Sequence, residues 1–128
     1  MTAAPPRQRL VSHRRGLGGE RLAALLLMVK GYRILARRYA ALGGEIDLVA
    51  KRGSTIAFVE VKARPTLDEA LTAVNAQKAR RMSSACRRWL TENDWAMAMT
   101  LRGDLVAIAP RRFPRHLEAA IDLDLGHA

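Results

Sequence analysis

The chain has 128 residues and a mass of 14.2 kDa, which suits one domain with a single modest core. Hydrophobic residues make up 49% of it, which excludes both a disordered chain and a membrane span. Lysine and arginine number 22 against 12 acidic residues, giving a net charge of +10, and 18 of these cations are arginine. Because arginine binds phosphate bidentately and stacks on bases, nucleic acid is the first expected partner. An anionic membrane surface, or a basic protein without a polyanionic partner, remains an alternative.

The single cysteine, Cys86, excludes an internal disulfide and a thiolate metal cluster, and it favours a reducing compartment. Residues 1–15 are polar and arginine-rich, without the apolar region of a secretory signal. The longest apolar run, over 22–29, is too short to cross a bilayer. These features predict a cytoplasmic protein.

The first 15 residues are expected to form a disordered basic arm, since they hold prolines and arginines but no acid. Such an arm either lies along phosphates or only keeps the chain soluble. The folded domain is expected over residues 16–124, followed by a short tail at 125–128. It opens with glycines and a helix over 20–30, which Gly31 closes.

Strands and one long helix are predicted after this first helix. The predicted segments are a strand over 32–39, a strand over 45–51, a tight turn at Gly53-Ser54, a strand over 55–64, a helix over 68–93 and a strand over 99–109. Alternation along the second strand predicts that Ile46 and Leu48 face the same side of the sheet. Residues 111–124 fit either a last strand or a short helix. This order predicts an α/β fold, a three-layer sandwich with a central mixed β-sheet flanked by helices.

The turn between the second and third strands decides which residues face each other across that hairpin. A two- or four-residue loop puts Asp47 directly opposite Glu60, whereas a three-residue loop puts Val59 there. In the first register the two carboxylates share a face, with β-carbons about 5 Å apart. Lys62 follows Glu60 by two positions and therefore points from the same face.

Two directly opposed carboxylates repel each other, so the pair needs a cation between them. That cation is either a neighbouring lysine or arginine, or a hard divalent metal such as Mg²⁺, which prefers carboxylate oxygens and water. Mg²⁺ would acidify its bound water and polarise a phosphoryl oxygen, and the Lys62 ammonium would neutralise charge on the reacting phosphate. The pattern predicts metal-dependent phosphodiester hydrolysis. The competing interpretation is a solvated, salt-bridged strand face.

Two strings in this hairpin resemble those of a known bacterial family. They are Gly44-Glu45-Ile46-Asp47-Leu48-Val49-Ala50 and Phe58-Val59-Glu60-Val61-Lys62-Ala63-Arg64. Together with Gly19-Glu20 and Lys78-Ala79-Arg80-Arg81-Met82, they make the chain similar to the YraN family, functionally uncharacterised proteins, from Gly19 to about Ile108. The resemblance extends to the PD-(D/E)xK nuclease superfamily, including archaeal Holliday-junction resolvases and tRNA-splicing-endonuclease-like domains. It implies a restriction-endonuclease-like fold.

The resemblance also implies a catalytic and metal-binding role for four residues. Asp47 and Glu60 match the metal ligands, and Lys62 matches the catalytic lysine. Glu20 matches the first-helix acid that completes the site in resolvase-like members; without the resemblance it is an ordinary first-turn glutamate favoured by the helix dipole. The implied cofactor is Mg²⁺ or Mn²⁺. Glu45 belongs to the family string without an implied role.

Contacts to nucleic acid are expected mainly from the basic face of the long helix. The candidate residues are Arg64, Gln77, Lys78, Arg80, Arg81, Arg87 and Arg88. For Gln77 and Lys78 the superfamily pattern also implies reach into the active site. A merely solvated helix face is the alternative.

The expected function is therefore a metal-dependent endonuclease, with DNA, including branched or damaged DNA, expected ahead of RNA. One alternative is a nucleic-acid- or ribosome-associated binding module that keeps the fold without the activity. Another is a protein–protein adaptor whose basic surface is incidental. No membrane partner is expected. The resemblance to resolvases, which pair as symmetric dimers, leaves open that this chain forms a homodimer.

Overall fold

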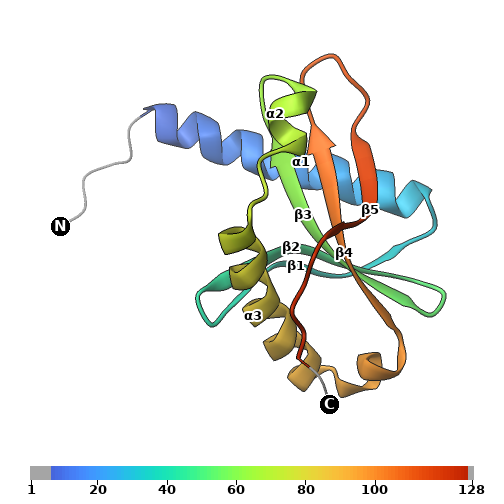
Figure 1. The fold of residues 1–128 in the computed structure, drawn as a ribbon. Coiled ribbons are helices and arrows are strands. Elements are labelled where there is room, and N and C mark those ends of the chain that lie inside the picture. Colours follow the sequence, from blue (N-terminus) through green and yellow to red (C-terminus); the bar gives the residue numbers. More distant parts are fainter. Residues whose placement is uncertain (1–6, 127–128) are drawn as a thin grey trace.

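A computed structural model describes the backbone of residues 7–126 and the side chains of residues 18–126. The elements in chain order are α1 (Arg7–Val29), β1 (Arg33–Ala41), β2 (Gly44–Arg52), β3 (Thr55–Ala63), α2 (Leu67–Leu71), α3 (Ala76–Glu92), the 3-10 helix η1 (Asp94–Ala98), β4 (Thr100–Ile108) and β5 (Arg115–Ile121). The five strands form one sheet in the order β1-β2-β3-β4-β5 (Figure 1).

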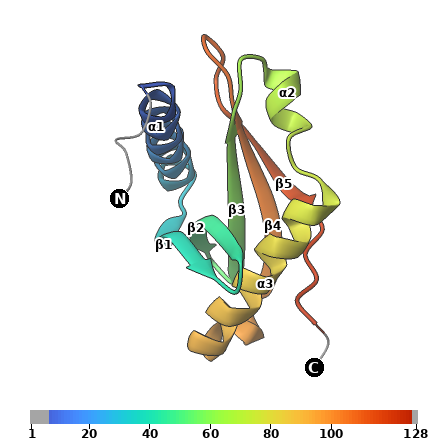
Figure 2. The ribbon, with the colours of Figure 1, turned by 90° about the vertical axis from the view of Figure 1, so that its left-hand side faces the viewer.

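The sheet is the middle of three layers, with α1 on one face and α3 on the other (Figure 2). β1, β2 and β3 form an antiparallel meander, β4 runs parallel to β3, and β5 is antiparallel to β4. A parallel pair needs a long crossover, and here the crossover contains α2, α3 and η1. The predicted three-layer α/β sandwich with a central mixed sheet is confirmed.

Each face of the sheet buries its own hydrophobic cluster. On the α3 face, Phe58 packs edge-on against Trp89, with ring centroids 5.6 Å apart. On the α1 face, Leu27 of the helix lies among Val59 and Val106 of the sheet. The middle strands are therefore buried on both sides, which explains their nearly continuous apolar runs.

The helix α1 is longer than the helix predicted over 20–30. It begins at Arg7, so residues 7–15 of the predicted arm are helical, whereas residues 1–6 lie outside the described residues. Each glycine weakens a helix interior by only about 0.5–1 kcal/mol, so the glycines near residue 18 do not interrupt it. Its blue first half extends beyond the sheet (Figure 1). Within residues 7–126, no helix is both long and apolar enough to cross a membrane.

The helix α1 ends where the sequence predicts. Gly31 has a φ of +95°, which favours glycine, and its N–H donates to the Met28 carbonyl at 3.0 Å. The Tyr32 N–H donates to the Leu27 carbonyl at 2.9 Å. This pair of bonds is a Schellman motif, and it turns the chain from α1 into β1.

The helix predicted over 68–93 is in fact two helices, so the prediction of one continuous helix is wrong. α2 and α3 are separated by residues 72–75, and Asn75 caps α3 by accepting a hydrogen bond from the Lys78 N–H at 2.9 Å. α2 has its own cap, because the Thr66 hydroxyl accepts a bond from a backbone N–H in its first turn. A residue that caps a helix in this way has an extended backbone conformation. Asn75 therefore starts a new helix, α3, and does not continue α2.

One apolar residue of β2 faces the side opposite to the one predicted. Ile46 packs in the α3-side cluster with Val49, whereas Leu48 packs in the α1-side cluster. The regular pairing of β2 with β3 reaches only to the Leu48–Val59 pair. Side chains alternate strictly between the two faces of a strand only where the strand is regularly paired. The alternation along β2 therefore fails at Asp47, where the pairing of β2 with β3 stops.

A buried ionic cluster joins β5 to β4. The fully buried Asp104 carboxylate accepts hydrogen bonds from Arg102 Nε at 2.8 Å and His116 Nε2 at 2.7 Å. The Ala119 N–H adds a third bond at 3.0 Å. Burial alone would raise the pKa of Asp104, but these bonds outweigh it and hold the pKa below its usual range. Of the two alternatives for residues 111–124, the structure shows a strand.

Gly44, at the start of β2, lies against the backbone of α3. An added Cβ there would stand 1.8 Å from the Arg81 carbonyl oxygen, so a larger residue has to displace the helix. We expect Gly44→Ala to lower the free energy of unfolding by about 1–3 kcal/mol, the usual cost of overpacking. Urea unfolding followed by tryptophan fluorescence measures this change.

Gly18→Ala is the matched control, because an added Cβ at Gly18 meets nothing within 4 Å. Alanine is favoured over glycine in a helix by roughly 0.5–1 kcal/mol, so this variant should be slightly more stable than the wild type. Wild-type stability of Gly44→Ala would contradict the close approach of β2 to α3.

Candidate active site

Charged side chains from β2, β3 and α3 meet in a pocket of about 460 Å³ beside the turn between β1 and β2. Gly43 and Gly44 line the edge of the pocket where β2 approaches α3. The charged lining residues are Glu45, Asp47, Glu60, Lys62, Lys78 and Arg81. Five of these six are residues to which the sequence analysis gives a role. The pocket joins segments that lie far apart in the chain.

The hairpin register that brings Asp47 near Glu60 is the predicted one. Arg52 pairs with Thr55 across the two-residue turn, and the same register continues to the Leu48–Val59 pair. The strands then part, and the Asp47 Oδ2 atom accepts a hydrogen bond from the Val61 N–H at 2.7 Å. The Asp47 carboxylate thus takes the place of a backbone partner for β3.

Lys62 and Glu60 form an ion pair, with 2.8 Å between Lys62 Nζ and Glu60 Oε1. Both side chains are largely buried, with exposures of 8% for Lys62 and 14% for Glu60. Burial alone would lower the pKa of Lys62, but the Glu60 carboxylate outweighs it and raises the pKa. Lys62 is therefore a fixed, permanently charged group inside the pocket at neutral pH.

The environment of Asp47 strongly disfavours its charge. Burial is the main cause, the negative charge of Glu60 adds to it, and the bond from the Val61 N–H opposes them. Together they raise the pKa of Asp47 to about 7. At neutral pH this carboxylate is only partly ionised, which is the expected state of an acidic pair without enough cationic charge nearby.

Lys78 faces the same pocket from the first turn of α3. The adjacent Lys62 ammonium lowers the pKa of Lys78, and partial burial lowers it further. Two ammonium groups in one small pocket repel each other, so the pocket favours an anion that both can contact. A phosphate oxygen is such an anion.

Glu20 lies outside this pocket, in a neighbouring cavity of about 150 Å³. That cavity is lined by Arg38, Glu45 and Asp47 as well, so Asp47 faces both spaces. Burial is the main cause that raises the pKa of Glu20, and Arg38, whose guanidinium is 3.8 Å away, partly opposes it. Glu20 is thus next to Asp47 but on the α1 side of it.

The remaining predicted nucleic-acid contacts are not all near the pocket. Arg81 lines it, whereas Gln77 and Arg80 are exposed on α3 and do not. Three of the arginines have partners within the protein, and the first is Arg64, which donates to the Ala63 carbonyl at 2.8 Å. Arg87 donates to the Asp124 carbonyl and to the Ser84 hydroxyl, and Arg88 pairs with Glu92 at 4.0 Å. Arg64 lines a separate groove past the end of β3.

Arg38 is a site residue to which the sequence analysis assigns no role. The Tyr39–Ile46 and Arg37–Leu48 pairs place Arg38 opposite Asp47 on the neighbouring strand. The sequence contains the information needed to predict this position. A two-residue turn between β1 and β2 places Arg38 opposite Asp47, just as the two-residue turn between β2 and β3 places Asp47 opposite Glu60. Gly44 was part of a recognised string, but only the helix packing shows why the position is crowded.

The two carboxylates of this pocket are of the ligand type that a magnesium ion takes. Among the described side chains, no three Asp, Glu, His or Cys residues are grouped closely enough to chelate a metal. Mg²⁺, however, is usually held by one or two carboxylates, with water and substrate phosphate completing the coordination. Asp47 and Glu60 are two carboxylates lining one open pocket, where burial and then the negative charge of Glu60 raise the pKa of Asp47.

Fold and pocket together define a three-layer α/β protein with an acidic pair and a lysine where two paired strands separate. The chain belongs to the uncharacterised protein family UPF0102, also called YraN, whose family model matches residues 19–108. The matched range covers every strand from β1 to β4 and all the residues that line the pocket. The resemblance to the YraN family is confirmed.

Proteins of the same family from other bacteria are similar along nearly their whole length. A UPF0102 protein of Methylobacterium nodulans is 59% identical over 92% of this chain and 92% of its own. One from Methylorubrum extorquens is 57% identical over 95% of each chain. One from Methylocella silvestris is 56% identical over 87% of this chain and 90% of its own. Their names state the family and no activity.

The raised pKa of Asp47 predicts how stability depends on pH. Below about pH 4 the carboxyl is protonated in both the folded and unfolded states. Between pH 4 and about 7 the folded protein keeps a proton that the unfolded chain releases, so this group favours unfolding increasingly as the pH rises. Asp47→Asn should therefore gain on the order of 2–4 kcal/mol of unfolding free energy relative to wild type across that range.

Urea unfolding of both proteins in a metal chelator, at several pH values from 4 to 8, checks this prediction. Asparagine can still accept the bond from the Val61 N–H, so the comparison isolates the charge. Titrating groups far from Asp47 cancel in the difference. A difference that stays constant with pH would show that Asp47 ionises as freely in the folded protein as in the unfolded chain.

Proposed function

We propose that this protein is a metal-dependent endonuclease that hydrolyses phosphodiester bonds, with DNA ahead of RNA as its substrate. The observation that carries the proposal is the meeting of Asp47, Glu60 and Lys62 in one pocket, with Lys78 facing them. Each of these groups has a part in phosphodiester hydrolysis. The single cysteine of the chain supports a reducing, cytoplasmic setting for the reaction.

In this proposal Asp47 and Glu60 hold Mg²⁺ or Mn²⁺, and Glu20 supports Asp47 from the neighbouring cavity. When bound, such an ion supplies a Lewis acid and an acidified water molecule. Asp47 and Glu60 are suited to the task because both are partly buried and the negative charge of Glu60 disfavours ionisation of Asp47 unless a further cation is present. The hydrogen bond to the Val61 N–H fixes the orientation of the Asp47 carboxylate.

Lys62 stabilises the charge that develops on the phosphate as the attacking oxygen approaches. Its ammonium is fixed by Glu60 and shielded from solvent, so it needs little reorganisation during the reaction. Lys78 and Arg81 come from α3, on the opposite wall of the pocket, and bind the phosphates on either side of the scissile bond. Long-range attraction of the polyanion is supplied by the excess of 10 positive charges.

A second candidate function is a nucleic-acid-binding module without catalysis. The observation that favours it is the 2.8 Å ion pair between Lys62 and Glu60, because a lysine already neutralises one member of the acidic pair. In this case Lys62 has only a structural role, and the basic surface serves binding alone. The two functions differ in their response to metal and to replacement of Lys62.

Metal binding is the first test of the nuclease proposal. We expect Mn²⁺ to raise the melting temperature of the wild type, because an ion that binds only the folded state stabilises it by about 1.4 kcal/mol at ten times its Kd. Asp47→Asn should lose this response, since it removes one of two charged ligands. Differential scanning fluorimetry and calorimetric titration measure both effects.

Asp122→Asn is the control for this experiment, because Asp122 is an exposed aspartate on the C-terminal segment, outside the pocket. It removes the same charge and should keep the full response to Mn²⁺. Equal responses from wild type and Asp47→Asn would place the bound metal elsewhere and would leave the binding module as the better description.

Replacement of Lys62 separates catalysis from binding. We expect Lys62→Ala and Lys62→Gln to bind nucleic acid within a few-fold of wild type and to cut it about 10²–10³ times more slowly, the scale for loss of one preorganised charged group. Excess Mn²⁺ should partly restore Asp47→Asn and should not restore the Lys62 variants. Rates on a panel of duplex, single-stranded and branched substrates, with circular dichroism to confirm folding, give the answer.

Two results would overturn the nuclease proposal. A wild-type protein that cuts nothing on the panel would favour the binding module. A folded Lys62→Gln that cuts at the wild-type rate would show that the Glu60–Lys62 pair is only a charged strand face.

A further inference from the structure

The loop between β4 and β5 has an unusual combination of side chains. It lies at the same end of the molecule as α2 (Figure 1) and contains the run Pro110-Arg111-Arg112-Phe113-Pro114. Phe113 is 92% exposed, more than any other large hydrophobic side chain of residues 18–126. The ring is held out by a loop with a proline on each side, where it contributes nothing to the core.

A groove of about 710 Å³ lies between this loop, α1 and the end of β3. Its floor is mainly apolar and includes Leu22 of α1 and Ile108 of β4. Its edges carry Arg64, Arg111 and Arg112. None of these three arginines pairs with an acid among the described side chains, so their charges are available to an anionic ligand.

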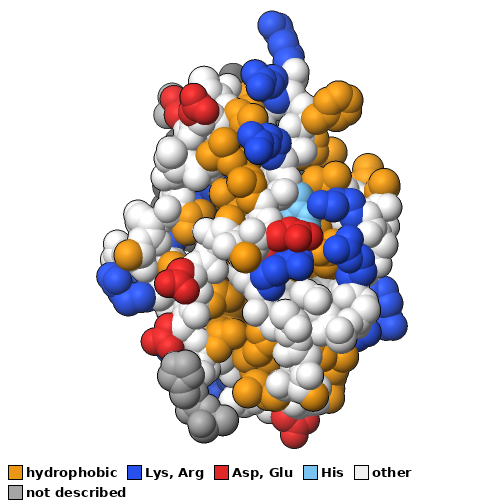
Figure 3. Space-filling view, turned by 45° about the vertical axis from the view of Figure 1, so that its right-hand side comes forward, with side chains coloured by type: hydrophobic (Ala, Val, Ile, Leu, Met, Phe, Trp, Pro, Cys, Tyr) orange, Lys and Arg blue, Asp and Glu red, His pale blue; other side chains and the backbone are white. Residues whose placement is uncertain are grey.

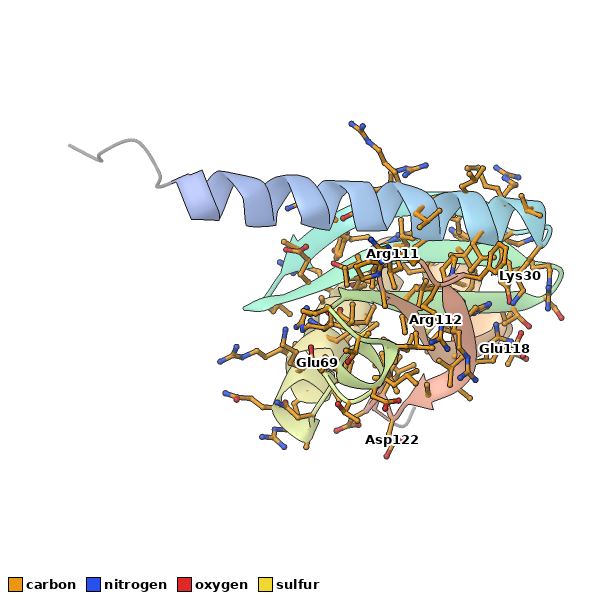
Figure 4. All side chains as sticks on the ribbon, turned by 90° about the horizontal axis from the view of Figure 1, so that it is seen from above. Lys30, Glu69, Arg111, Arg112, Glu118 and Asp122 are labelled. Atoms are coloured by element: carbon orange, nitrogen blue, oxygen red, sulfur yellow. The ribbon has the colours of Figure 1, made fainter. Side chains whose placement is uncertain are left out.

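The arginines and hydrophobic side chains also lie together in the figures. Figure 4 looks down on this end of the molecule and labels Arg111 close to α1 and Arg112 farther from it. At the top of the space-filling view, basic side chains lie beside protruding hydrophobic ones (Figure 3). A surface that alternates cations with apolar groups suits a ligand that alternates phosphates with flat, apolar faces.

The groove and the pocket open on opposite faces of the sheet, and both lie near the end of β3. Lys62 and Ala63 pair with Ala107 and Ile108 of the parallel strand β4, and the Arg64 N–H donates to the Ile108 carbonyl at 3.0 Å. Both strands therefore end side by side, one residue past Lys62. A nucleic-acid strand that contacts both must therefore pass around the end of β3.

We propose that this groove and the β4–β5 loop bind an unpaired segment of nucleic acid, with Phe113 stacking on a base and the arginines contacting phosphates. Single-strand binding sites combine a basic groove with aromatic rings in this way. The bases of an intact duplex are stacked inside it and cannot reach the ring. The substrate class is therefore nucleic acid with a single-stranded part, such as an overhang or a fork.

A membrane surface is the other class that an exposed phenylalanine beside arginines could contact. The observations favour nucleic acid because the apolar groove beside Phe113 is concave and carries three arginines, whereas insertion into lipid needs a broad convex apolar face. The inference rests on the proposed function only for where the substrate is cut. Binding at the loop is measured separately, under conditions in which nothing is cut.

The test compares binding of a blunt DNA duplex with the same duplex carrying a single-stranded overhang, in a metal chelator so that nothing is cut. Fluorescence anisotropy of the wild type should show tighter binding to the overhang substrate. Phe113→Ala should weaken binding to that substrate about ten-fold, within the range for loss of one stacked base, and leave blunt duplex unchanged. Phe113→Tyr should keep the preference, and Phe113→Leu should lose it.

Charge is tested separately with Arg112→Ala, for which Arg33→Ala is the matched control, because Arg33 is also exposed but lies on β1 at the other edge of the sheet. Only Arg112→Ala should reduce the slope of log K against log[salt] for the overhang substrate by about one phosphate contact. Equal slopes for both variants and the wild type would overturn the role of the groove arginines.

Three outcomes of the Phe113 series would overturn the inference. They are no preference for the overhang in the wild type, equal loss on both substrates in Phe113→Ala, and a Phe113-dependent binding to phosphatidylserine vesicles that Phe113→Leu retains. A wild type that cuts nothing but keeps its Phe113-dependent preference would refute the proposed catalysis and support the binding site. A wild type that cuts nucleic acid but has no Phe113-dependent preference for the overhang would support the proposed catalysis and refute the binding site.

Discussion

The site depends on the separation of β2 from β3, which occurs where the Val61 N–H donates a hydrogen bond to the Asp47 carboxylate. Up to the Leu48–Val59 pair, β2 and β3 are joined by ordinary backbone bonds; beyond it they separate. A side-chain oxygen then satisfies a buried backbone donor that would otherwise be unpaired, which is costly in a sheet. The separation of the strands makes room for the pocket into which Glu60 and Lys62 point. The bond to Asp47 thus supplies the missing partner of β3 at the place where the pocket forms.

The second constraint is the balance of charge around that separation. Carboxylates at Glu20, Glu45, Asp47 and Glu60 come from α1, β2 and β3. The cations opposite them come from β1, β3 and α3, as Arg38, Lys62 and Lys78. Because these charges come from five elements, including both helices, they meet only when both helices are packed on the sheet. The site is therefore a property of the whole sandwich.

Much of this arrangement follows from the sequence. The turn residues give the register of the β2–β3 hairpin, and the glycine after α1 gives its end, because both depend on local backbone chemistry. The break between α2 and α3 was missed, since Asn75 is compatible with helical periodicity until its capping role is recognised. The orientation of Ile46 and the internal partners of Arg87 depend on tertiary contacts, which periodicity does not contain.

The outer strands of the sheet differ from the inner ones in a way that bears on solubility. β1 exposes Arg33, Arg37 and Arg38, and its pairing with β2 shifts register near Ala36. At the other edge, Ala119 of β5 has a positive φ of 54°, and its N–H bonds to a side chain, Asp104, where the pairing with β4 also shifts. Charge on one edge and a bulge on the other hinder the addition of a further strand from another molecule. Although the inner strands of the sheet are strongly apolar, its two edges therefore disfavour edge-to-edge aggregation of the protein at high concentration.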